Sequence, residues 1–121
     1  MRLGEVRDIL GAQVLLGEQL MERDVASACG SDLMSDVLAF TKQKTLLLTG
    51  LTNIQVIRTA DISDLCAIVF VRGKIPCKEV LEAAAQDNLP ILVTGHTLFE
   101  ACGRLYAQGL SGCPRKAVTH E

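Results

Sequence analysis

The chain carries apolar side chains at two different spacings, and each spacing predicts a different kind of element. In five segments the apolar residues recur every three or four positions, as they do on the buried stripe of an amphipathic helix. These segments predict helices at residues 3–10, 33–40, 54–60, 77–88 and 97–108. Ser31 or Asp32 is the expected N-cap of the second helix, and Thr52 or Asn53 that of the third. Taken alone, residues 54–57 could also form a strand.

Shorter apolar runs lie between the predicted helices and have the length of strands. They predict strands at residues 13–16, 24–29, 45–49, 66–71 and 90–94. Gly30 is expected to end the second of these strands. Residues 45–48, 66–71 and 91–93 are almost continuously apolar, which is typical of strands covered on both faces, so we expect three adjacent buried strands.

The order of these elements predicts an α/β fold with a mostly parallel sheet flanked by helices. In the second half of the chain, strands and helices alternate with short connections, which indicates parallel strands joined by right-handed crossovers. A chain of 121 residues with 49% hydrophobic content suits one domain, and 3% aromatic content predicts an aliphatic core. We expect this domain at residues 1–110 and a frayed tail at residues 111–121, which have no periodic pattern.

Charge and hydropathy bear on the partners. Twelve basic and 14 acidic residues give a net charge of −2, without the basic excess that nucleic-acid binding needs. The apolar runs are shorter than the ~20 residues of a membrane span, and the first residues match a helix better than a signal peptide, so we expect a cytoplasmic protein. A mean hydropathy of +0.30 indicates a homo-oligomer, most simply a dimer, with Leu33, Met34 or Leu98 at the contact.

The cysteines show neither a disulfide framework nor a zinc-binding pattern. Their number is odd and no CxxC pair occurs. We therefore interpret them as reduced thiols, of which Cys66 and Cys102 occupy apolar positions where small buried side chains are common. The five are Cys29, Cys66, Cys77, Cys102 and Cys113.

Three segments carry a resemblance to a known family. Residues 67–110 read AIVFVRGKIPCKEVLEAAAQDNLPILVTGHTLFEACGRLYAQGL, and SDLMSDVL and TLLLTGLTN precede them. Over residues 25–110 the chain resembles the DRTGG domains and the related N-terminal domain of HPr kinase/phosphorylase. Thr52-Asn53 stands where the family has Asp-Arg, and Arg72-Gly73-Lys74 where it has Thr-Gly-Gly.

The resemblance implies a regulatory or small-ligand-binding module that is not an enzyme. The sequences SDLMSDVL and VRGK are similar to those of short family members found beside iron-only hydrogenase genes in anaerobic bacteria. This resemblance implies an association with a redox system. Other members are fused to phosphotransacetylase or to CBS-domain pyrophosphatases. In HPr kinase/phosphorylase the chemistry belongs to a separate P-loop domain, which has no counterpart here.

Candidate ligand-binding residues lie in or beside three loops that follow predicted parallel strands, at residues 50–53, 72–74 and 94–97, and we expect these loops to meet at one edge of the sheet. Open α/β sheets bind ligands where such strands end and helices begin, and helix N-termini favour anions. The candidates are Thr49, Gly50, Asn53, Arg72, Gly73, Lys74, Thr94 and Thr97. Arg72 and Lys74 indicate an anionic small molecule such as a nucleotide or an acyl phosphate. The alternative is that these loops only turn the chain and that both cations are solvated surface charges, because no GxxxxGK[ST] or GxGxxG motif occurs.

No combination of residues predicts catalysis, a metal or a cofactor. Asp32 and Asp36 would share a helix face and could hold Mg²⁺, although such residues more often cap a helix. His96 and His120 lack a recognisable catalytic partner. We therefore rank a ligand-binding regulatory module first and a structural homo-oligomeric interaction protein without a ligand second. A small enzyme that uses Asp32, Asp36 or His96 ranks last.

Overall fold

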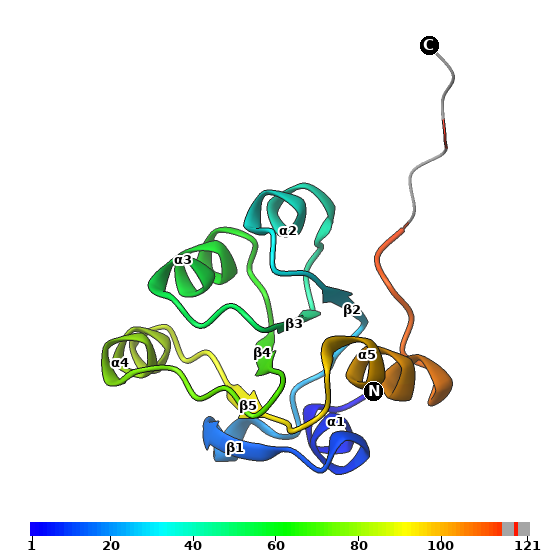
Figure 1. Ribbon diagram of the computed structural model, residues 1–121, viewed down its shortest axis with the longest axis horizontal. Helices are drawn as coiled ribbons and strands as arrows, with labels where there is room; N and C mark the ends of the chain where they lie inside the picture. Colours follow the sequence, from blue (N-terminus) through cyan, green and yellow to red (C-terminus); the bar gives the residue numbers. More distant parts are fainter. Residues whose placement is uncertain (115–117, 119–121) are drawn as a thin grey trace.

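The computed structural model describes residues 1–114 and 118, and they form a five-stranded sheet between two layers of helices (Figure 1). The strands are β1 (Gln13–Leu16), β2 (Ser27–Gly30), β3 (Thr45–Thr49), β4 (Ala67–Phe70) and β5 (Ile91–Val93). The helices are α1 (Leu3–Leu10), α2 (Met34–Phe40), α3 (Ile54–Ile62), α4 (Lys78–Gln86) and α5 (Leu98–Ala107), with a short 3₁₀ turn η1 (Glu18–Leu20). None of the helices in these described residues is long and apolar enough to span a membrane.

The strand order is β1-β5-β4-β3-β2, so the sheet is mostly parallel, as predicted. Strands β2, β3, β4 and β5 run parallel to one another, and only β1, which pairs with β5, is antiparallel. The three apolar runs form β3, β4 and β5, which are adjacent and buried at every position. The α/β fold class and the three central strands are therefore confirmed.

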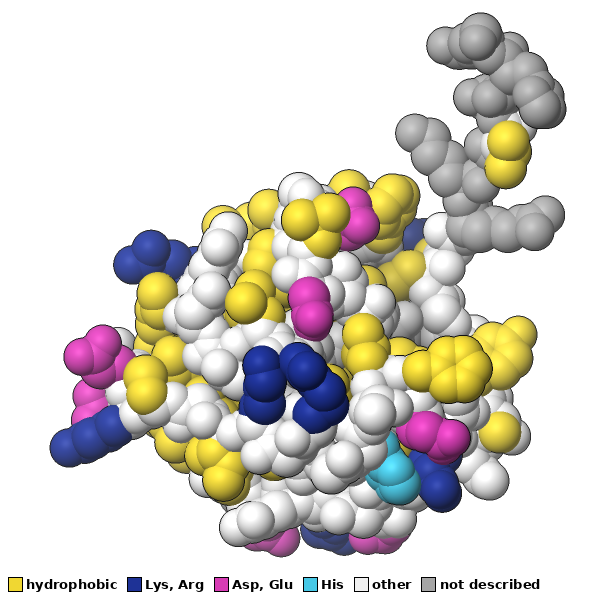
Figure 2. Space-filling view, in the orientation of Figure 1, with side chains coloured by type: hydrophobic (Ala, Val, Ile, Leu, Met, Phe, Trp, Pro, Cys, Tyr) yellow, Lys and Arg dark blue, Asp and Glu magenta, His cyan; other side chains and the backbone are white. Residues whose placement is uncertain are grey.

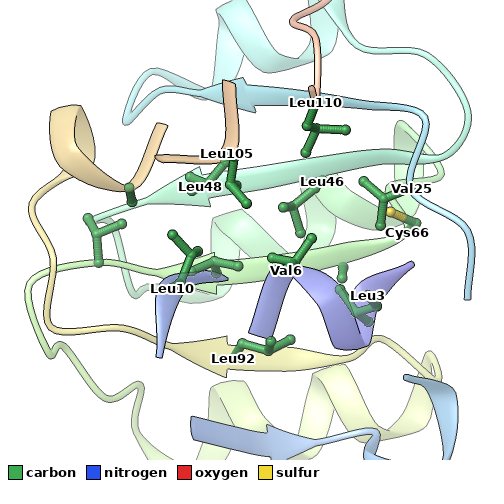
Figure 3. Close-up of a cluster of buried hydrophobic side chains, with 14 of the residues drawn as sticks. Leu3, Val6, Leu10, Val25, Leu46, Leu48, Cys66, Leu92, Leu105 and Leu110 are labelled. Carbon is green, nitrogen blue, oxygen red and sulfur yellow. The ribbon is translucent and has the colours of Figure 1, made fainter. Parts of the chain in front are cut away.

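Alternate side chains of the central strands pack into two separate cores. On β3, Leu46 and Leu48 face one core and Leu47 faces the other, because successive strand residues point to opposite faces of the sheet. Helices α1 and α5 cover the first face, where Leu3, Val6 and Leu10 of α1 and Leu105 of α5 join Leu46, Leu48 and Leu92 (Figure 3). Helices α2, α3 and α4 cover the second (Figure 1).

Strand β2 is the element whose bounds differ most from the prediction. Residues 24 and 25 pair with the N-terminus instead of β3: Asp24 bridges Arg2, and the Val25 N–H donates to the Met1 carbonyl at 2.7 Å. Gly30 is the last residue of the strand, one position later than predicted. A Cβ there would lie 2.6 Å from Cys102 Sγ, so the glycine lets α5 approach this end of β2.

The predicted tail begins with residues that contact the sheet. The Ala28 N–H donates to the Ser111 carbonyl at 3.0 Å, and Ala28 and Gly112 form a parallel bridge on the outer edge of β2. Leu110 lies in the core beneath this contact. Residues 115–117 and 119–121 of the predicted tail lie outside the described residues.

Candidate functional site

The loops that follow β4 and β5 are joined by backbone hydrogen bonds. The Arg72 N–H donates to the His96 carbonyl and the Gly73 N–H donates to the Thr94 carbonyl, each at 2.8 Å. Parallel strands end at the same edge of a sheet, which is why these two loops were expected to meet. Both loops also lead directly into helices, α4 and α5.

The loop after β4 is a tight turn that places two cations at this edge. Arg72 and Gly73 have φ values of 59° and 65°, and the Lys74 N–H donates to the Val71 carbonyl at 3.2 Å. Two successive residues at positive φ are the mark of a type I′ turn. A left-handed conformation costs roughly 1–2 kcal/mol for a residue such as Arg72, which the two hydrogen bonds to the β5–α5 loop help to offset.

The side chain of Arg72 reaches the third loop, after β3. A Cβ at Gly50 would lie 2.7 Å from Nη2 of Arg72, so the guanidinium rests directly on this glycine. The expected meeting of the three loops is therefore confirmed. The helices that follow the β3 and β5 loops have side-chain caps, because Asn53 accepts from the Gln55 N–H and Thr97 accepts from the Glu100 N–H. The helical interpretation of residues 54–57 is confirmed as well.

A fourth loop, after β2, brings Asp32 to the same place. Asp32 Oδ1 accepts from the Gly50 N–H at 2.7 Å and from Thr49 Oγ1 at 2.8 Å. The expectation that Ser31 or Asp32 caps α2 is wrong, because Leu33 occupies the cap position and the carboxylate is held across the sheet. A helix-face pair of Asp32 and Asp36 is therefore absent, and the described residues contain no group of three or more potential metal ligands.

The hydrogen bonds to Asp32 favour its charged form. The Gly50 N–H and then the Thr49 hydroxyl lower the pKa of this carboxyl, partial burial opposes them, and Arg72 and Lys74 act in the same direction as the hydrogen bonds. Sequence reasoning could have found this role from one signal. Asp32 comes two positions after the end of a strand that pairs in parallel with β3, so it had to lie near the end of β3.

Lowering the pH should weaken the fold through Asp32. A carboxyl whose pKa is lowered on folding stabilises the folded state above its unfolded pKa, near 3.8, and this contribution is lost as the pH falls through the lower folded value. We expect Asp32→Asn to reduce the free energy of unfolding at pH 7 by about 0.5 kcal/mol, because solvent screens a side chain this exposed, and to flatten the loss of stability below about pH 4. Urea unfolding at a series of pH values measures both effects.

Asp36→Asn is the matched control, because Asp36 is an exposed carboxylate on α2, close to Asp32 in the sequence but outside its hydrogen bonds to Thr49 and Gly50. The free energy of unfolding of the Asp36→Asn variant should follow that of the wild type across the pH range. Equal pH profiles for Asp32→Asn and the wild type would contradict the assigned role of Asp32.

The candidate residues divide into internal and exposed ones. Thr49 and Thr94 are buried, and their hydroxyls donate to Asp32 and to the Leu10 carbonyl, so both stabilise the loops instead of facing a ligand. Gly50 is also buried and gives its N–H to Asp32. The exposed candidates are Asn53, Arg72, Gly73, Lys74 and Thr97.

Arg72 and Lys74 are the exposed charges that remain available at this edge. Neither forms an ion pair within the part of the chain that the structure describes. Figure 2 shows basic side chains gathered near the middle of one face of the molecule, with an acidic side chain beside them. Helices α3 and α5 begin at the same edge, and their N-terminal N–H groups add a partial positive charge. The arrangement suits an anion.

A hollow of about 440 Å³ lies at the opposite edge of the sheet, where β3, β4 and β5 begin. Its polar lining mixes both signs of charge: Arg23 donates to the Cys66 carbonyl, and Lys44 pairs with Asp24. Asp64 and Asp87 also line it. No pattern in the sequence singled out this hollow, because its residues come from four separate connections.

Comparisons with known proteins agree with this fold. The family model of the DRTGG domain matches residues 5–107. A similar solved structure is that of the CBS and DRTGG domains of the regulatory region of Clostridium perfringens pyrophosphatase, complexed with its activator diadenosine tetraphosphate. The TM-score is 0.69 at 19% identity, over 91% of this chain and 47% of that one, so this chain spans about half of that structure. No curated protein matched the sequence. The family match covers most of the chain, and the chain therefore belongs to the DRTGG domain family.

Proposed function

We propose that this DRTGG domain is a non-catalytic regulatory module that binds a small anionic ligand, such as a nucleotide, where β3, β4 and β5 end. The observation that carries the proposal is the meeting of three strand-to-helix loops around two exposed cations, Arg72 and Lys74. Neither cation pairs with a described acidic side chain, and a phosphate group would supply the missing partner.

Each exposed residue of the cluster has a distinct part in this proposal. The planar guanidinium of Arg72 can donate two hydrogen bonds to one phosphate, and Lys74 adds a second positive charge. Asn53 and Thr97 lie at the N-termini of α3 and α5, where an amide or a hydroxyl can donate to a ligand oxygen. Asp32 offsets one positive charge, so the anion would approach from the side of the two cations.

The nucleotide is the ligand class that the comparison favours. The similar pyrophosphatase structure contains a diadenosine nucleotide with four linked phosphates, bound to a regulatory region built from CBS and DRTGG domains. A ligand with several phosphates also matches a site that has two cations. The resemblance to members encoded beside iron-only hydrogenase genes is the basis for the further proposal that the regulated partner belongs to an anaerobic redox system.

The proposal assigns no catalytic role, and the surroundings of Asp32 and His96, two residues that a small enzyme would use, support this. Asp32 is held by Gly50 and Thr49, which lowers its pKa and makes it a poor general base at neutral pH. The His96 carbonyl accepts a hydrogen bond from the Arg72 N–H in the β4–α4 loop, and the His96 N–H donates to Thr94 Oγ1. These residues therefore shape the site.

A thermal-shift screen tests the proposal. The ligands are AMP, ATP, diadenosine tetraphosphate and acetyl phosphate, and uncharged adenosine is the control. A ligand at 100 times its Kd should add about 2.7 kcal/mol, a rise in Tm on the order of 10 °C for a domain of this size. The proposal fails if none of the anions raises the Tm, or if adenosine raises it as much as ATP does.

Exposed aromatic side chains support a second candidate function, assembly as a homodimer. Phe99 and Tyr106 are 86% and 73% exposed and lie seven positions apart on α5, so they share one face of the helix. Phe40 is also exposed, and aromatic residues are enriched at interfaces. Leu33 is exposed as well, but Met34 is buried, so the expectation of Met34 at a contact is wrong. Light scattering should give about twice the 13.0 kDa of one chain, and a mass near 13.0 kDa would exclude a dimer.

A further inference from the structure

The tail and the outer edge of β2 are in parallel register. The Ala28 N–H donates to the Ser111 carbonyl, and Ala28 bridges Gly112. One residue further along both segments, this register places Cys113 beside Cys29. Neighbouring strands lie about 4.8 Å apart, which is within the Cα separation of about 4.4–6.8 Å that a disulfide requires.

The side chains of these two cysteines belong to the same face of the sheet. Cys113 Sγ lies 4.0 Å from Ser27 Oγ, and Ser27 is two positions before Cys29 on β2, where side chains share a face. Cys102 lies on the other face, because its Sγ fills the space where a Cβ of Gly30 would be. Both Cys29 and Cys113 are half-buried, so a small oxidant can reach them.

We propose that Cys29 and Cys113 form a redox-dependent disulfide that holds the C-terminal segment on the edge of β2. The oxidant is a low-molecular-weight disulfide, RSSR. The thiolate of Cys113 attacks one sulfur of RSSR, which breaks its S–S bond and releases RS⁻. The thiolate of Cys29 then attacks Cys113 Sγ in the mixed disulfide and releases the second RS⁻. Both thiol protons go to the two RS⁻ groups, so the net products are the protein disulfide and two RSH.

The environment of Cys29 fits the second of these steps. Burial, together with Cys113, Cys102 and Asp36, raises the pKa of the Cys29 thiol, which makes it slow to react with an external disulfide. Once Cys113 carries a mixed disulfide, the two sulfurs are neighbours, and proximity replaces the need for a strongly acidic thiol.

The bond would close a loop of more than 80 residues and fix the open edge of the sheet. Restricting so long a loop in the unfolded chain is a major source of disulfide stabilisation. Segment 111–113 would then remain as a covalently attached extension of the sheet, and reduction would return it to non-covalent contacts with β2. The strength with which this segment is held on the β2 edge would thus depend on the redox state.

The test treats the full chain with glutathione disulfide and maps the product by mass spectrometry. All variants carry Cys77→Ser, which removes the exposed thiol. We expect one intramolecular bond that links the peptides of Cys29 and Cys113, a rise in Tm on the order of 10 °C, and full reversal by a thiol reductant.

Two further variants separate this pair from the third thiol nearby. Cys113→Ser should lose the intramolecular bond and the rise in Tm, whereas Cys102→Ser should keep both. A bond that involves Cys102, mixed disulfides without a protein disulfide, or a Cys29–Cys113 bond that leaves the Tm unchanged would each overturn the proposal.

Discussion

Replacing Ile68 with Asp is expected to prevent folding. Ile68 lies on β4, the middle strand of the sheet, is 0% exposed, and faces the core beneath α2, α3 and α4. Its neighbours in register are Leu47 and Ile91, which offer no partner for a charge. An unpaired carboxylate there should cost more than about 4 kcal/mol, most of the stability of a small domain.

Ile75→Asp is the matched control, because Ile75 is 65% exposed in the β4–α4 loop. We expect this variant to be expressed in soluble form with the circular dichroism of the wild type. Ile68→Asp should appear in the insoluble fraction or lack the cooperative thermal transition. A soluble Ile68→Asp protein with a wild-type melting curve would contradict the placement of β4 at the centre.

Replacing Gly17 with Ala is expected to lower the free energy of unfolding by about 3 kcal/mol. Gly17 has a φ of 89°, which is unfavourable for any residue with a side chain. A Cβ at this position would also lie 2.9 Å from both Cα and Cβ of Pro90, at the start of β5. Backbone cannot move aside as a flexible side chain can, so strain and clash add together.

Gly11→Ala separates the two contributions. Gly11 ends α1 with a φ of 57°, but nothing lies within 4 Å of the position of its Cβ. We expect only the conformational cost, about 1 kcal/mol. Urea unfolding of both variants measures the difference. Equal losses at the two positions would mean that β5 does not pass Gly17 as closely as the structure shows.

The central part of the fold could be predicted because local pattern and burial coincide there. Residues 46–48 are apolar at every position, as expected only for a strand that is covered on both faces, and they lie in β3, which is such a strand. The start of β2 could not be predicted in this way. Val25 is apolar and extended, but the hydrogen bond from its N–H to the carbonyl of the distant Met1 decides its partner. The contact between Ala28 and Ser111 depends in the same way on the tertiary structure.

The candidate site shows the same division. The sequence predicted that the loops at residues 50–53, 72–74 and 94–97 meet, because parallel topology places them at one edge. The loop of Asp32 was missed, since its local sequence matches a helix cap equally well. Thr49 and Thr94, like Thr97, lie between a strand and the following helix. The hydroxyl of Thr49, however, donates to Asp32, and that of Thr94 donates to the Leu10 carbonyl. Sequence alone does not show where a hydroxyl at the end of a strand finds its partner.

Calorimetric titration of diadenosine tetraphosphate into the wild type, Arg72→Ala and Arg58→Ala tests the ligand site most directly. Arg58 is an exposed cation on α3, outside the three loops, so its removal is the matched control for charge. We predict that the wild type and Arg58→Ala bind with equal affinity, and that Arg72→Ala binds about tenfold or more weakly, because it loses charged hydrogen bonds to phosphate. The Tm of Arg72→Ala without ligand should stay close to that of the wild type, since an exposed cation contributes little to stability. Equal affinities of the wild type and Arg72→Ala, or no binding to the wild type, would contradict a nucleotide site at these loops.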